Sequence, residues 1–216
     1  MTSELKKKAL TSLKGKWGFA VGSTFLYILA SAFGSYVISG IIAILSNWFQ
    51  DTFLQVVLSL ISVLATFFLT GILVLGIFKI YLGLAQGKNV QVGDLFSYFA
   101  GWAKIWKAFL TVFFLTLYTF LWSVLLIVPG IIKSFSYSLT YFVLLDHPEF
   151  TVNRALGESK RLMQGQKWKL FVVLLSFIGW YLLSIITLGL ANLWVTPYVS
   201  VSFAHFYENL KKSDVA

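Results

Sequence analysis

Two histidines are the side chains in this sequence best suited to catalysis or metal binding. His147 and His205 fall at the ends of apolar stretches, and Asp146, Glu149 and Glu208 stand close to them along the chain. An imidazole beside a carboxylate could transfer protons or hold a metal ion. The two histidines lack the spacing of a motif such as HExxH. We therefore interpret them as polar caps at helix ends, with an intramembrane acid–base site as the alternative.

Other kinds of catalytic site lack the residues that they require. The chain has no cysteine, which excludes disulfides, thiol nucleophiles and thiolate metal sites. It also lacks the glycine-rich patterns that bind nucleotide phosphates. We expect a protein that is not an enzyme and that needs no cofactor and no metal ion.

The composition indicates a membrane protein. Of 216 residues, 58% are hydrophobic and 12% are charged, whereas a soluble domain usually carries about 25% charged residues. A helix needs about 20 apolar residues to cross a bilayer. Six stretches approach this length: residues 19–45, 53–84, 105–128, 131–145, 170–188 and 191–207. We predict one all-α domain, residues 1–216, with six transmembrane helices in three hairpins, and a turn at Pro129-Gly130.

The basic residues predict how the chain is oriented. Six spans place all but Lys133 of the 17 basic residues on the same side as the two termini. Cytoplasmic loops are enriched in Lys and Arg, so both termini are expected in the cytoplasm, with the protein in a bacterial cytoplasmic membrane. The net charge of +9 does not favour nucleic acid as a partner, because the basic residues flank apolar spans. The expected partners are the lipid bilayer and its anionic headgroups.

A similar segment precedes each hairpin, with an amphipathic pattern followed by basic and aromatic residues. These segments lie near residues 5–17, 95–107 and 152–169, and each is predicted to be a cytoplasmic helix at the membrane interface. The predicted membrane anchors are Trp17, Trp102, Trp106, Lys167, Trp168 and Lys169. The pattern fits either a threefold repeat or the recurrence of such anchors at any cytoplasmic interface.

Polar residues inside the spans allow two interpretations. Lys133, Tyr137 and Tyr141 lie four residues apart on the fourth span, as do Asn192 and Thr196 on the sixth. Polar groups in lipid are costly, so these five residues could line a polar cavity between the two helices. The interpretation that we favour is that they form hydrogen bonds that hold helices together, at about 0.6 kcal/mol each.

Several motifs resemble one bacterial membrane family. They are Trp122-Ser-Val-Leu-Leu-Ile-Val-Pro-Gly-Ile-Ile-Lys133, Asp146-His-Pro148, Leu13-Lys-Gly-Lys-Trp17, Ser176-Phe-Ile-Gly-Trp180, Pro197-Tyr198 and Ala204-His-Phe-Tyr207. The combination is similar to the domain of unknown function (DUF) nine-seven-five over nearly the whole chain. More distantly, it is similar to the membrane domain fused to some glycerophosphodiester phosphodiesterases. The resemblance implies a six-helix integral membrane protein and supplies no catalytic residues.

Two functions follow as hypotheses. We favour a non-enzymatic membrane protein that acts through lipid or protein contacts in the cell envelope, alone or as a homo-oligomer or with a membrane protein partner. The alternative is a small transporter or channel with a polar path between the fourth and sixth helices.

Overall fold

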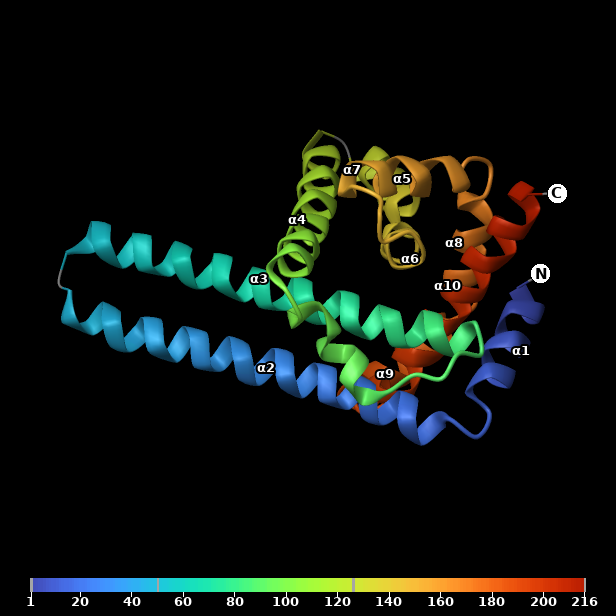
Figure 1. The fold of residues 1–216 in the computed structure, drawn as a ribbon, viewed down its shortest axis with the longest axis horizontal. Coiled ribbons are helices and arrows are strands. Elements are labelled where there is room, and N and C mark those ends of the chain that lie inside the picture. Colours follow the sequence, from blue (N-terminus) through green and yellow to red (C-terminus); the bar gives the residue numbers. More distant parts are fainter. Residues whose placement is uncertain (1, 50, 126, 216) are drawn as a thin grey trace.

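The fold is entirely helical over the residues that the structure describes. This computed structural model describes residues 2–49, 51–125 and 127–215 (Figure 1), and no strand occurs among them. The helices, in order, are α1 (Thr2–Leu13), α2 (Trp17–Trp48), α3 (Thr52–Ala85), the 3-10 helix η1 (Val92–Phe99), α4 (Trp102–Leu125), α5 (Ile127–Tyr137), α6 (Thr140–Asp146), α7 (Val152–Leu162), α8 (Lys167–Leu175), α9 (Ile178–Ile186) and α10 (Asn192–Val215). The all-α prediction is confirmed.

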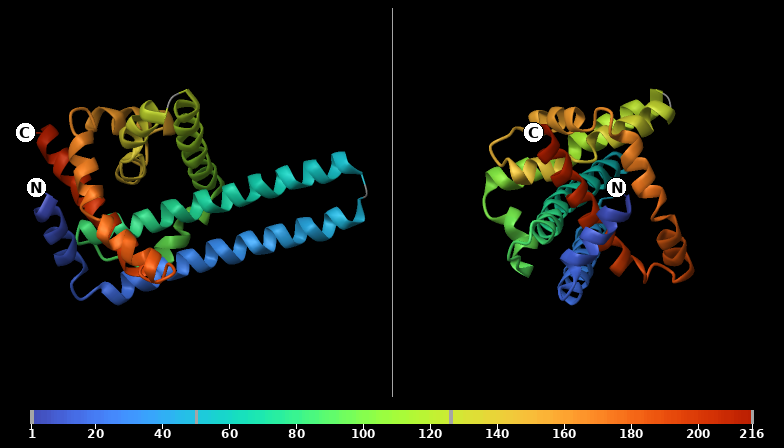
Figure 2. Two further views of the ribbon diagram at one scale, coloured as in Figure 1. Left: turned by 180° about the vertical axis from the view of Figure 1, so that it is seen from behind. Right: turned by 90° about the vertical axis from the view of Figure 1, so that its right-hand side faces the viewer.

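Helices α2 and α3 form a long hairpin that extends beyond the rest of the molecule (Figures 1 and 2). The sequence has no charged residue between Lys16 and Asp51, or between Asp51 and Lys79, so α2 and most of α3 carry no charge. Asp51 starts the return helix, because its carboxylate accepts hydrogen bonds from the backbone N–H groups of Phe53 (2.8 Å) and Leu54 (3.1 Å). The start of α1 and the end of α10 lie at the opposite end of the molecule from this turn (Figure 1).

Helix α4 and η1 approach the α2–α3 hairpin closely at two glycines of α3. A Cβ on Gly71 would lie 3.2 Å from the Ala108 carbonyl oxygen of α4, and one on Gly76 would lie 1.9 Å from the Leu95 carbonyl oxygen of η1. Helix α4 then runs across α3 instead of alongside it (Figures 1 and 2). The segment near residues 95–107, predicted to be an interfacial helix, is therefore divided between η1 and the start of α4, and it is packed against α3.

The predicted fourth span, residues 131–145, is divided between two helices. Helix α5 ends at Tyr137 and α6 begins at Thr140. Ser159 of α7 supports the break, since its buried hydroxyl accepts a hydrogen bond from the Leu139 N–H (3.2 Å) and donates one to the Ser136 carbonyl (2.9 Å). The fifth span is likewise divided, between α8 and α9.

The predicted turn at Pro129-Gly130 is misplaced. Both residues lie in the first turn of α5, which begins at Ile127. Proline has no N–H to donate, and the first turn of a helix needs none, so the helix can begin ahead of it. Leu126, inside the predicted third span, lies outside the described residues.

The two amphipathic helices direct their apolar faces into the protein. Leu5, Ala9 and Leu13 of α1 are fully buried, and α1 packs mainly on α10. Helix α7 packs on α6 and α5, and the side that faces them is likewise buried. The buried apolar residues are Val152, Ala155 and Leu156 of α7 and Met163, which follows the helix. The faces that remain exposed carry lysine and arginine, so the apolar stripes predicted for the membrane surface are protein core.

Five helical segments in the described ranges are long and apolar enough to cross a membrane. They are Trp17–Trp48, Thr52–Ala85, Trp102–Val124, Val128–Asp146 and Lys167–Ile186. The predicted sixth span, residues 191–207, is not among them and, apart from its first residue, lies within α10. Val201, Ala204 and Phe206 of that helix are buried in the core. Helix α10 therefore packs as a central element of the protein, in contact with α1, α2, α3 and α9.

Candidate functional site

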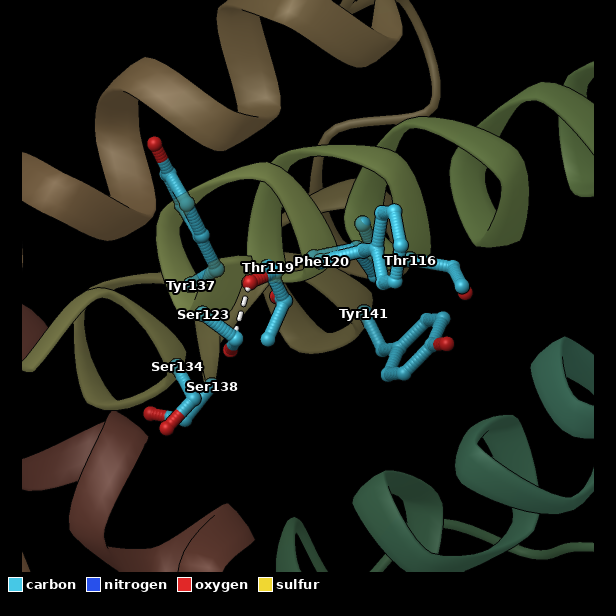
Figure 3. Close-up of a pocket in the computed structure, with 9 residues that line it drawn as sticks. Thr116, Thr119, Phe120, Ser123, Ser134, Tyr137, Ser138 and Tyr141 are labelled. Carbon is cyan, nitrogen blue, oxygen red and sulfur yellow. Dashed lines mark hydrogen bonds between the residues drawn. The ribbon is translucent and has the colours of Figure 1, made fainter. Parts of the chain in front are cut away.

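A groove of about 500 Å³ lies between α4 and the broken pair α5–α6. Seven of its nine lining residues bear a hydroxyl group (Figure 3), while carbon atoms make up most of its accessible surface. Helix α4 contributes Leu115, Thr116, Thr119, Phe120 and Ser123, and the facing segment contributes Ser134, Tyr137, Ser138 and Tyr141. Among the residues that the structure describes, no lysine, arginine or carboxylate lines the groove. The groove therefore suits an uncharged, largely apolar molecule with a few hydrogen-bonding groups better than an ion.

The serine hydroxyls of the groove are held by their own helices. Ser123 donates to the Thr119 carbonyl, Ser134 to that of Ile131, and Ser138 to that of Phe135, each at 2.8 Å. Because each proton is already used, these oxygens can offer only lone pairs to a molecule in the groove. The groove is therefore rich in hydrogen-bond acceptors.

The two tyrosines of the groove face different surroundings. Tyr137 and Tyr141 point away from each other (Figure 3). The Tyr137 ring lies 6.2 Å from that of Tyr118 on α4, and the Tyr141 ring lies 4.8 Å from that of Phe78 on α3. Tyr141 thus ties the groove to the α2–α3 hairpin.

The structure brings together only two of the five residues predicted to line a polar cavity. Tyr137 and Tyr141 line the groove, whereas Lys133 lies over the Trp122 ring, 4.3 Å from its centroid. Asn192 and Thr196 belong to the first turns of α10 and are not part of the groove wall. The groove lies between the predicted third and fourth spans, because α5 packs on α4, α7 and α8.

The sequence analysis missed the hydroxyls of α4. Thr116, Thr119 and Ser123 are spaced three and four residues apart, which places them on one face of a helix. That spacing was a readable signal. Ser134 and Ser138 are four residues apart on the next segment, and only the fold shows that the two sets line the same groove (Figure 3).

Three of the four predicted tryptophan anchors lie at the surface. Trp102 is 73% exposed, Trp168 72% and Trp106 47%. Trp102 and Trp106 stack with a centroid separation of 6.4 Å, and Trp168 is flanked by Lys167 and the exposed Lys169. Trp17 differs, since it is partly buried and its ring meets that of Tyr198 on α10 edge-on at 6.4 Å.

The histidines occupy separate structural positions. His147 Nδ1 lies 3.2 Å from Glu149 Oε1, and its ring stacks on Phe150 with a centroid separation of 4.6 Å. His205 Nε2 lies 2.9 Å from the Ser12 hydroxyl and so links α10 to α1. Over the described residues, no group of three or more histidine and acidic side chains could hold a metal ion.

Asp146 connects the end of α6 to α10. Its carboxylate accepts hydrogen bonds from the Tyr207 hydroxyl (3.0 Å) and from Lys211, and the rings of Tyr207 and Phe142 stack. The hydrogen bond to Asp146 raises the pKa of Lys211 above its usual value, although partial burial opposes this. These contacts hold the end of α6 against the C-terminal part of α10.

These features define a helical protein with several apolar helices of membrane-spanning length, as in multi-pass membrane proteins. The family is shown directly, because the sequence model of the family described as protein of unknown function (DUF975) matches residues 1–134 and 123–214. The chain belongs to this family. No curated protein and no solved structure matches it.

Proposed function

We propose that this protein is a non-enzymatic, multi-pass protein of the bacterial cytoplasmic membrane that acts through contacts with lipids and with membrane protein partners. The outer half of the α2–α3 hairpin supports this proposal best. Phe33, Ile44, Val63 and Leu64 there are 56–65% exposed. A soluble protein rarely leaves so continuous an apolar surface in water, whereas acyl chains would cover it.

The distribution of charge supports an orientation with the termini in the cytoplasm. Lysines cluster on α1, and basic residues line the exposed side of α7, while the turn of the α2–α3 hairpin at the far end carries only Asp51. Basic segments beside a membrane favour its cytoplasmic, anionic face. In this orientation the hairpin turn reaches the outer surface.

The absence of cysteine makes a topology experiment simple, since each introduced cysteine is the only thiol. Lys14→Cys, Lys160→Cys and Asn47→Cys all replace exposed residues. With a membrane-impermeant maleimide, Asn47→Cys is expected to react in intact cells, and the two lysine variants only after permeabilisation. Reaction of Lys14→Cys in intact cells would show that the orientation is the reverse of the one proposed. Recovery of the chain in the soluble fraction would overturn the proposal.

A small transporter is the second candidate, and the hydroxyl-lined groove favours it. A transport path past α4 requires water to reach Thr119 and Ser138 from both sides of the membrane. Single cysteines at these two positions should then react with small soluble reagents added to either side. Protection of both positions from one side would exclude a continuous path.

A further inference from the structure

A second cavity of about 500 Å³ gathers lysines from two helices. It lies where the end of α3, η1, the start of α4 and the end of α6 meet. Its wall consists of Lys79, Ser97, Tyr98, Ala103, Lys104, Lys107, Leu144, Leu145 and Pro148. All three charged side chains in this set are lysines. We propose that this cavity, the lysine pocket, binds the phosphate group of an anionic ligand, supplied by a lipid headgroup or by a soluble phosphate.

Two of the three lysines keep a charge that no ion pair neutralises. Lys79 is paired with Asp94 at 2.7 Å. Lys107 donates a hydrogen bond to the Pro148 carbonyl, which is neutral and leaves two further donors on the ammonium group. Across the described ranges, no carboxylate forms an ion pair with Lys104 or Lys107. Two such charges balance a phosphate monoester dianion and exceed the single negative charge of a phosphate diester.

The remainder of the lysine pocket is apolar. Leu144 is buried, and Ala103 and Leu145 extend the same wall. Tyr98 adds an aromatic surface, and the Ser97 hydroxyl is bound to the Asp94 carbonyl at 2.8 Å. A cavity with cationic and apolar parts fits a phosphate attached to a carbon chain better than inorganic phosphate alone.

The position of the pocket on α4 favours a lipid. Lys104 and Lys107 share the first turns of α4 with the exposed Trp102 and Trp106. Exposed tryptophans at the end of an apolar helix sit at headgroup depth in a bilayer. If the protein lies in the membrane as proposed above, the lysine pocket stands at the level of lipid phosphates, where basic pockets between helices bind anionic headgroups. The choice of a lipid as the ligand therefore rests on the proposed function.

Binding is measured with the full chain purified in detergent, by titrating its thermal unfolding midpoint. The probes are phosphatidylglycerol, phosphatidylcholine, glycerol 3-phosphate and inorganic phosphate. The variants are Lys104→Gln and Lys107→Gln, with Lys107→Arg as the charge-preserving rescue and Lys14→Gln just after α1 as the matched control. Each glutamine variant is expected to weaken phosphatidylglycerol binding about tenfold or more, because it removes one charge-assisted hydrogen bond. Lys107→Arg, Lys14→Gln and the wild type should bind alike, and phosphatidylcholine should have no effect.

The possible results distinguish a failure of the lysine pocket from a failure of the proposed membrane function. If glycerol 3-phosphate or inorganic phosphate binds and the same two glutamine variants weaken it, the pocket stands with a soluble ligand. If phosphatidylglycerol stabilises every variant equally, lipid contact survives and the lysine pocket is overturned. The pocket is also overturned if no anionic probe shifts the wild-type midpoint. If a glutamine variant unfolds at a lower temperature than the wild type in the absence of ligand, it has a folding defect. The affinity of the Lys107→Arg variant for phosphatidylglycerol then decides whether the lysine pocket stands.

Discussion

Ser159 shows how one buried hydroxyl can hold a break between two helices. Its oxygen accepts from the Leu139 N–H and its proton goes to the Ser136 carbonyl, so both backbone groups at the end of α5 and the start of α6 are paired. All three residues are almost completely buried. Buried backbone groups without partners are costly, and water cannot reach these. Ser159 thereby fixes α7 against the segment that carries the groove tyrosines.

Replacing Ser159 should therefore destabilise the protein far more than replacing an exposed serine. Ser159→Ala leaves the Leu139 N–H unpaired, which should cost about 1–3 kcal/mol and lower the thermal unfolding midpoint in detergent. Ser213→Ala is the control, since Ser213 is exposed and bonds only to the nearby Leu210 carbonyl. Equal midpoints for the two variants would show that the hydroxyl does not hold the break.

A second prediction at this scale concerns pH. Partial burial opposes ionisation of Asp94, but the hydrogen bond from the Gln91 N–H (2.9 Å) and the pair with Lys79 outweigh it, so the pKa of Asp94 is lowered. A lowered folded-state pKa contributes stability above the unfolded pKa of about 3.9 and loses it as the pH falls further.

The measurement compares unfolding midpoints of the wild type and Asp94→Asn between pH 7 and pH 3. The wild type should have the higher midpoint at pH 7, and the difference should shrink once the pH falls below about 3.9. The remaining acidic residues are the same in both proteins, so their contributions cancel in the difference. A difference that persists undiminished at pH 3 would contradict the assignment.

At the scale of elements, the sequence predicted where helices are and missed how several of them pack. Long apolar runs with at most one charged residue each located α2, α3 and α4 to within a few residues. The break after Tyr137 could not be foreseen, because neither glycine nor proline marks it and its support comes from Ser159, some twenty residues away. The apolar stripe of α1 correctly predicted which face of the helix is buried. It did not predict that this face packs on α10, because an apolar stripe fits lipid and protein equally well.

The contact between η1 and α3 gives the sharpest test at this scale. A Cβ at Gly76 would lie 1.9 Å from a backbone carbonyl, so Gly76→Ala must push η1 away from α3. We expect a cost of about 1–3 kcal/mol, as for overpacked cores, seen as a lower midpoint and faster proteolysis after Lys88. Gly22→Ala on α2 is the control, because no atom lies within 4 Å of its Cβ position. The close packing is disproved if both variants unfold at the same temperature.

At the scale of the whole molecule, the protein has two parts with different surfaces, the outer half of the α2–α3 hairpin and the part near the termini. The part near the termini is packed around α10 and carries nearly all the charge. The outer hairpin extends away from it (Figure 1), and many of its apolar side chains are exposed. Twenty residues of helix span about 30 Å, so the outer hairpin alone matches the thickness of a bilayer core. A charged side chain on this surface is tolerated in water and costly in lipid, so a single substitution distinguishes the two surroundings.

Leu60→Lys distinguishes the two. Leu60 is 58% exposed and lies nine residues beyond Asp51, about 13 Å along α3, which is near the centre of a bilayer that the hairpin crosses. In water, a lysine there would be harmless. In lipid it should cost about 2.5–3.5 kcal/mol, so the amount of protein recovered in the membrane fraction should fall several-fold. Leu10→Lys is the control, since Leu10 is 44% exposed among the lysines of α1 and should tolerate the charge. Equal recovery of both variants would mean that the outer hairpin does not lie in lipid.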